Sequence, residues 1–270
     1  LRTSDKDKTD RISLLTKEYE ASLLNKEVSD QYFSRCHEIK GLTLLQDVFS
    51  KGVIWDDSKS KPGPDFKSSI ADFELVCLHK GDSYKSDYDC KTGIISDEEK
   101  RYYDLRITTA LKSKLCQYRN KIRINEDKPY VVVLSFGGIR NRIYSIQNGI
   151  EITRVLLAKD IPYIVIDRHT KDIVDSGYMF KDYHVKESGC LVSRRYFCEE
   201  NSDLSAVIIT YSNLIEDYSL SKCILFLNPF AKHRMDLHYF DQTIYWQTDE
   251  GGFYCPYFKG VKIENVQRII

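Results

Sequence analysis

KSKPGPDFKSSIADFELVCLHKGD, residues 59–82, is the stretch from which the fold and the chemistry of this chain are best inferred. Pro64 keeps the chain out of a helix, the two serines after Lys67 suit a turn, and the run DFELVCL that follows has a β-type pattern. We therefore predict a β-hairpin, with Asp65 ending one strand and Glu74 within its partner. Because paired strands lie about 5 Å apart, the two carboxylates can face each other across the hairpin.

Two carboxylates in that arrangement suit a hard divalent cation such as Mg²⁺, which prefers oxygen ligands and keeps several waters. The same pattern also has a plain structural interpretation. In that interpretation Asp65 is a turn residue and Glu74 lies on a solvated face of its strand. The hairpin alone leaves both interpretations open, so the rest of the chain has to be weighed.

The composition limits the classes of protein to consider. The chain has 270 residues, enough for one large domain with a sizeable core, and its 40 basic and 40 acidic residues leave nucleic-acid contacts to a local patch. The eight cysteines form no CxxC pair, which indicates a reducing, cytoplasmic compartment and no zinc site. Without an apolar run of 18 residues or a signal-like start, we expect a soluble protein with no membrane partner.

The apolar spacing predicts alternating helices and strands, and an α/β fold with five or six strands and helices on both faces is the most economical arrangement. We expect one domain over 1–270, with N-terminal helices (1–52), a sheet core (53–230) and a C-terminal elaboration (231–270). We predict an irregular polar segment at 79–98, regard the polar and mixed segment at 168–203 as too poor in apolar pattern to be a separate domain, and leave 234–246 unassigned. The predicted helices are 10–26, 29–41, 42–50, 98–122 and 143–157, and the predicted strands beyond the hairpin are 53–55, 130–136, 161–166, 206–210 and 223–227.

Other candidate residues lie on the predicted helices. Glu38 is next to an apolar stripe, and Lys114 and Gln117 share one helix face with Arg106 two turns earlier. Taken singly, each is explained as a solvated helix residue. Other site types are disfavoured, because the sequence has no HxxxH or HxH pair and no GxSxG elbow, and the glycines at 137–138 lack the rest of a phosphate loop.

Read together, the motifs resemble the PD-(D/E)XK restriction-endonuclease-like superfamily, whose core is αβββαβ. Pro64-Asp65 matches the PD and Glu74 matches the (D/E). The likeness is closer to a bacterial branch with R-x-x-E, G, PDF, E-x-V and T-x-A-L-x-x-K-x-x-Q-Y motifs, and it covers about residues 30–136. The matching segments are Arg35-Cys36-His37-Glu38, Gly52, Pro64-Asp65-Phe66, Glu74-Leu75-Val76 and Thr108 to Tyr118.

The resemblance implies a restriction-endonuclease-like mixed sheet flanked by helices and a metal-dependent nuclease, with DNA a better candidate than RNA. It implies Mg²⁺ or Mn²⁺ held by Asp65, Glu74 and the backbone carbonyl of Leu75, with Glu38 as a third acid. Lys114 and Gln117 would then act on the attacking water or the phosphate, with Arg106 as a phosphate clamp.

One position departs from the superfamily pattern. Val76 stands two residues after Glu74, where the pattern has lysine. Either Lys114 supplies that charge from the following helix, or the chain is a non-catalytic binding module on the same fold, such as a defence component or an effector delivered into another cell. An unrelated α/β enzyme for small molecules is a third reading, and oligomeric state does not follow from the sequence.

Overall fold

The computed structural model describes residues 13, 17, 26–49, 52–55, 64–78, 97–121, 127–136, 150–185, 189–210, 223–240, 242–250 and 254–263. Five sequence predictions concern segments outside these ranges. They are the N-terminal lead at 1–10, nearly all of the helix at 10–26, most of the irregular segment at 79–98, the glycine pair at 137–138 and the first half of the helix at 143–157.

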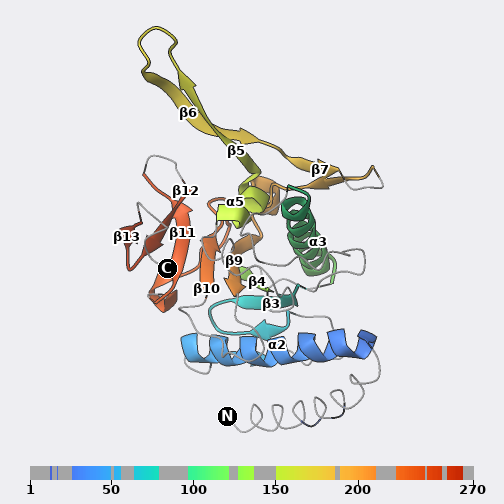
Figure 1. Cartoon of the computed structure of the whole chain (residues 1–270). Coiled ribbons are helices and arrows are strands. Elements are labelled where there is room, and N and C mark those ends of the chain that lie inside the picture. Colours follow the sequence, from blue (N-terminus) through green and yellow to red (C-terminus); the bar gives the residue numbers. More distant parts are fainter. Residues whose placement is uncertain are drawn as a thin grey trace, which may run out of the picture.

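A mixed sheet lies at the centre of the described structure (Figure 1). Its nine strands follow the order β1-β2-β3-β4-β9-β10-β11-β12-β13. β3, β4 and β9 run parallel to one another, as do β10 and β11, and the other neighbours are antiparallel. The strands are β1 (Ile54–Trp55), β2 (Phe66–Lys67), β3 (Asp72–Cys77), β4 (Tyr130–Ser135), β9 (Leu204–Thr210), β10 (Cys223–Leu227), β11 (Ile244–Thr248), β12 (Tyr254–Phe258) and β13 (Val261–Lys262).

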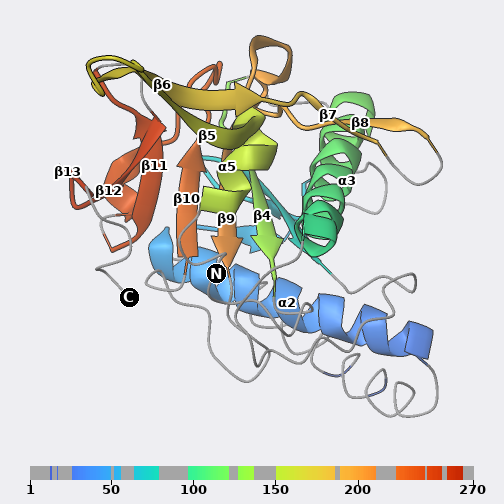
Figure 2. The same cartoon turned by 45° about the horizontal axis from the view of Figure 1, so that its top comes forward.

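Helices cover both faces of this sheet, which confirms the predicted α/β class (Figures 1 and 2). On one face α2 (Lys26–Val48) buries apolar side chains against β3, β4, β9 and β10. On the other face α3 (Asp97–Lys121) and α5 (Ile150–Leu157) pack on the opposite side chains of the same strands. The central strand β4 is buried along its whole length, as its continuous apolar run predicts.

The predicted strand number of five or six is wrong, because the edges of the sheet carry short strands with little apolar signal. β1, β2 and β13 have two residues each. The unassigned segment at 234–246 contains a short 3₁₀ helix, η3 (Leu237–Phe240), and the start of β11, which adds a parallel strand next to β10.

The two helices predicted to meet at Gly41 are one continuous helix, α2. Gly41 does not end the helix, because it serves the contact between α2 and β3. A Cβ on Gly41 would lie 2.2 Å from Cδ1 of Leu75, so any larger residue at this position requires the Leu75 side chain or the helix to shift. Leu75 directly follows the candidate metal ligand Glu74, and this contact therefore sets the position of α2 relative to the candidate site.

The strand predicted at 161–166 is present, but the prediction that it is buried is wrong. It belongs to β5 (Lys159–Ile166), which pairs only with β6 (Ile173–Phe180) in a separate two-stranded sheet. We call this antiparallel ribbon, residues 159–180, the arm. Figure 1 shows the arm projecting away from the main sheet, and none of the described helices or strands forms a covering layer over its apolar residues. An apolar run alone does not reveal whether another layer will cover it.

The polar and mixed segment at 168–203, for which the sequence predicts no strand, contains regular structure. Besides β6 it holds β7 (Tyr183–Val185) and β8 (Leu191–Ser193), which form a second two-stranded sheet, and the 3₁₀ helix η1 (Glu199–Asn201). The strands in this segment are largely exposed, so the alternation of polar and apolar residues that reveals half-buried strands is absent.

Within the described ranges, no helix is both long and apolar enough to cross a membrane. Cys198 and Cys223, the two buried cysteines described, are free thiols.

Candidate active site

The predicted hairpin is confirmed. β2 and β3 pair antiparallel, with Phe66 opposite Phe73, and the turn between them is closed by Ser68. The Ser68 hydroxyl accepts hydrogen bonds from the backbone N–H groups of Ile70 and Ala71, at 3.1 and 2.9 Å. One detail of the prediction is wrong, because Asp65 directly precedes β2 and does not end a strand. Its position opposite Glu74 is unaffected.

The register of the hairpin brings the two carboxylates close together. Ser68 N–H donates to the carbonyl of Ala71 at 3.0 Å, so this pair is hydrogen-bonded. Hydrogen-bonded and non-hydrogen-bonded pairs alternate along an antiparallel ladder. Counting back from Ser68, Asp65 and Glu74 fall at a non-hydrogen-bonded position, where the two side chains are closest.

Because Pro64 has no N–H, the backbone carbonyl of Leu75 is left available beside the two carboxylates. The register puts Pro64 opposite Leu75 at the next hydrogen-bonded position, but proline has no N–H to donate. The N–H of Leu75 donates to Oδ2 of Asp65 at 2.8 Å. Because N–H and C=O of a strand residue point toward the same edge, the Leu75 carbonyl also faces this edge, beside the carboxylates. The Pro-Asp pair thus explains how a backbone carbonyl becomes available next to two acidic side chains.

Lys114 reaches this position from the middle of α3. Its Nζ donates to Oε2 of Glu74 at 2.8 Å and lies 3.7 Å from Oδ2 of Asp65. The Glu74 side chain is only 4% exposed, whereas those of Lys114 and Asp65 are 20% and 31% exposed. The three groups therefore form a small polar site with a buried end at Glu74 and a solvent-accessible end at Asp65.

Val76 occupies the same face of β3 as Glu74, because side chains two residues apart in a strand share a face. Val76 packs against the apolar cluster that β3 and β4 share with α3 and does not enter the polar site. The positive charge at this face comes from the Lys114 side chain on the facing helix.

The electrostatics of Glu74 follow from its burial. Burial, with a hydrogen bond and charge repulsion from Asp65, raises the pKa of Glu74 from 4.5 to about 8, although Lys114 opposes the change. For Lys114, burial lowers the pKa, but the charges of Asp65, Glu74 and Glu38 raise it by more, so the net change is upward. Lys114 therefore stays protonated while Glu74 can take up a proton near neutral pH.

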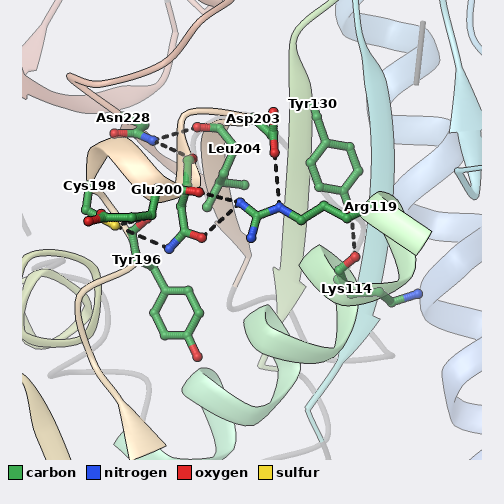
Figure 3. Close-up of polar contacts among 10 residues, drawn as sticks. Lys114, Arg119, Tyr130, Tyr196, Cys198, Glu200, Asp203, Leu204 and Asn228 are labelled. Carbon is green, nitrogen blue, oxygen red and sulfur yellow. Dashed lines mark hydrogen bonds and ion pairs between the residues drawn. The ribbon is translucent and has the colours of Figure 1, made fainter. Parts of the chain in front are cut away.

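Contacts that the sequence does not reveal hold α3 in place (Figure 3). Arg119 donates to Asp203 Oδ2 at 3.0 Å and to the Glu200 carbonyl at 2.7 Å, which ties the end of α3 to the segment before β9. The Tyr130 hydroxyl donates to the Lys114 carbonyl at 3.4 Å. Burial raises the pKa of Tyr130 well above its ordinary range, so this hydroxyl remains a donor. Figure 3 shows the Lys114 side chain directed away from the Arg119 contacts.

The remaining predicted residues lie on the two helices that flank this site. Glu38, half-buried on α2, acts on Lys114 through its charge. Gln117 is half-buried one turn after Lys114, and Arg106 is half-buried about 12 Å earlier along the helix axis. Among the described residues no group of three or more His, Cys, Asp or Glu side chains could hold a metal ion, so Glu38 does not complete a three-acid cluster with Asp65 and Glu74.

The donor set nevertheless fits a hard divalent cation. Two carboxylates and a backbone carbonyl lie at one edge of β3, and Mg²⁺ commonly takes one or two carboxylates and fills its remaining positions with water. No family model, no curated protein and no solved structure matches this chain.

Proposed function

We propose that this chain is a metal-dependent phosphodiester hydrolase acting on nucleic acid, with the restriction-endonuclease-like fold. The observation that carries the proposal is the position of Lys114, whose Nζ lies 2.8 Å from Glu74 and 3.7 Å from Asp65. In this proposal Lys114 supplies, from α3, the positive charge that the superfamily pattern places at position 76. The order α2-β1-β2-β3-α3-β4 supports the proposal because it repeats the αβββαβ core.

Asp65, Glu74 and the Leu75 carbonyl would hold Mg²⁺ or Mn²⁺, with Glu38 acting through water. The bound ion would supply Lewis acidity and a more acidic water, the two contributions of metals to phosphodiester hydrolysis. Glu74 must lose its proton to serve as a ligand, and Lys114 compensates the negative charge that remains. The protonated Lys114 would bind a phosphate oxygen at the accessible end of the site, and Gln117 and Arg106 would assist as hydrogen-bond donors from α3.

A specific observation supports a second candidate function. Lys114 Nζ already donates to Oε2 of Glu74 at 2.8 Å, and the described residues contain no three-acid cluster. In a non-catalytic binding module this contact would replace the metal and keep the fold intact. This alternative predicts neither metal binding nor cleavage.

Calorimetric titration with Mn²⁺ separates the two functions. Because the pKa of Glu74 is about 8, an enzyme should release close to one proton per bound ion at about pH 7, measured as a dependence of the heat on the buffer. Asp65→Asn and Glu74→Gln should abolish the binding heat. Asp236→Asn, an exposed carboxylate in a hydrogen bond to His238, is the matched control and should leave it unchanged.

Cleavage of single- and double-stranded DNA and RNA in Mg²⁺ completes the test. Lys114→Met should lower the rate at least about 100-fold, as loss of a charged transition-state contact does, while Lys112→Met on the exposed side of α3 should not. Metal binding without cleavage of any substrate would reject the nuclease, and absence of metal binding would favour the binding module.

A further inference from the structure

The arm carries a large apolar surface that no described element covers. Figures 1 and 2 show it at one end of the molecule, beyond the main sheet and its helices. An isolated two-stranded ribbon is only marginally stable in water, and an exposed apolar face on one calls for a partner.

The pairing register puts five exposed apolar side chains on one face of the arm. Ile166 pairs with Ile173 across the two strands, Pro162 pairs with Tyr178, and residues two apart in a strand share a face. The opposite face carries Val165 and Met179, and there the Tyr163 ring lies over Gly177 and its hydroxyl donates to Asp175 at 3.1 Å. We define the arm face by its five exposed apolar side chains, Ile164, Ile166, Ile173, Tyr178 and Phe180.

The exposed fractions of these side chains decide how large the patch is. They range from 45% for Tyr178 to 68% for Phe180. With 150–250 Å² for a whole large side chain, the five side chains of the arm face expose on the order of 600 Å². That is the upper end of the roughly 300–600 Å² typical of the largest patch on a monomer. Two such faces packed together would bury about 1,200 Å², the lower end of the range of about 1,200–2,000 Å² for specific interfaces.

The charges of the arm indicate what kind of partner fits it. Residues 159–182 contain five acidic and four basic side chains, spread along the strands and the turn between them. A surface for nucleic acid or for an anionic membrane would need an excess of positive charge. A second copy of the same arm presents the same balanced charges and the same apolar face.

The base of the arm is held firmly enough to present this face in a defined direction. Lys181 N–H donates to the Ala158 carbonyl at 2.9 Å, and Arg194 N–H donates to the Asp182 carbonyl at 2.8 Å. The fully buried Arg194 side chain lies 3.5 Å from Asp104 on α3. The arm is therefore anchored to the helix that carries Lys114.

We propose that two copies of this chain associate through their arm faces, around a two-fold axis, into a homodimer. The interface is isologous, so each copy contributes the same five residues. This proposal is independent of the hydrolase function, because a non-catalytic chain with the same arm would dimerise in the same way.

Sedimentation of the full chain, from about 1 to about 100 µM, tests the proposal. Wild type should sediment as a dimer with a dissociation constant of about 10 µM or lower. The double variant Ile164→Asp/Ile173→Asp should weaken dimerisation at least about 100-fold, since it puts four charges into one interface. Val261→Asp is the matched control, because Val261 is a similarly exposed apolar residue on β13, and it should leave the dimer unchanged.

Hydrogen exchange provides a second measurement that does not depend on a variant. The amides of β6 should become more protected as the wild-type concentration rises. A wild-type monomer at about 100 µM, a dimer that survives the double variant, or an equal loss in Val261→Asp would each overturn the proposal. So would a monomer whose arm binds anionic vesicles or nucleic acid.

Discussion

Replacing Glu74 with glutamine tests the electrostatics of the site without any substrate. In the folded chain the pKa of Glu74 is raised from 4.5 to about 8, mainly by burial. Between these two pH values the folded state holds a proton that the unfolded state has released. Raising the pH therefore favours unfolding, so the stability from Glu74 is complete below about pH 4.5 and lost as pH rises through about 8.

The expected size of this effect follows from the pKa difference. At about 1.4 kcal/mol for each tenfold change in proton affinity, wild type should lose on the order of 3–5 kcal/mol between about pH 5 and pH 8.5 relative to Glu74→Gln. For a chain of this size that is a difference of about 10 °C in Tm. Glutamine keeps a side chain of the same shape but has no proton to release in this range, so its stability should change less with pH.

Urea and thermal unfolding in EDTA, at several pH values, measure the effect. The matched control is Glu250→Gln, because Glu250 is exposed and should follow wild type. If wild type and Glu74→Gln gave parallel curves of stability against pH, the carboxylate would not be the buried, proton-binding group described above. A wild type that gains stability from pH 5 to 8.5 relative to Glu74→Gln would reverse the sign and refute the reasoning.

Three further substitutions test how the site is held. Lys114→Met should destabilise the fold by about 2–4 kcal/mol at pH 8.5, because it removes the hydrogen bond and the opposite charge that favour burial of the Glu74 carboxylate, and Lys112→Met should change stability by less than about 0.5 kcal/mol in the same urea titrations. Gly41→Ala gains about 1 kcal/mol of helix propensity but forces its Cβ against Leu75, so a net loss of about 1 kcal/mol is expected, and a rise in the urea midpoint would show that the contact yields freely. Arg119→Ala should cost about 1 kcal/mol and increase amide exchange at the end of α3, whereas unchanged exchange would mean that its hydrogen bonds do not hold the helix.

The sequence predicts the centre of the fold well because the central strands are buried on both faces. The runs at 130–136, 206–210 and 223–227 are continuous apolar segments, and each forms a strand of the main sheet. The long helix predicted at 98–122 is α3, Asp97–Lys121. In these segments the local apolar pattern agrees with the burial in the folded chain, so the pattern alone predicts the strand or helix correctly.

The same reasoning fails for the arm because burial depends on layers that the local sequence does not describe. The run at 161–166 is as apolar as β4, yet β6 is the one described strand that pairs with it, and the side chains of residues 163–166 remain exposed. Gly41 is misread for a related reason. Its role comes from a contact with Leu75, more than 30 residues away, and a helix-ending glycine and a packing glycine look alike in sequence.

The candidate site falls between these cases. The sequence brings Asp65 and Glu74 together because a hairpin register is local, and the structure agrees. The contact with Lys114 spans 40 residues and depends on how α3 packs against β3, so spacing alone leaves it as one of two alternatives. A side chain from a helix can supply a charge that is expected from a strand, as Lys114 of α3 does at the face of β3 that carries Val76.

This geometry also restricts how the missing strand lysine could be restored. A lysine at position 76 would replace a side chain that packs in an apolar cluster, and its charge would meet Lys114 at the same two carboxylates. We therefore expect Val76→Lys alone to destabilise the fold by about 2–4 kcal/mol, through lost packing and repulsion between like charges. In the double variant Val76→Lys/Lys114→Met the repulsion is removed, so the loss should be smaller than the sum of the two single losses by at least about 1 kcal/mol. Urea titration of the four proteins measures this coupling, and strictly additive losses would show that the two lysine positions do not converge on one site.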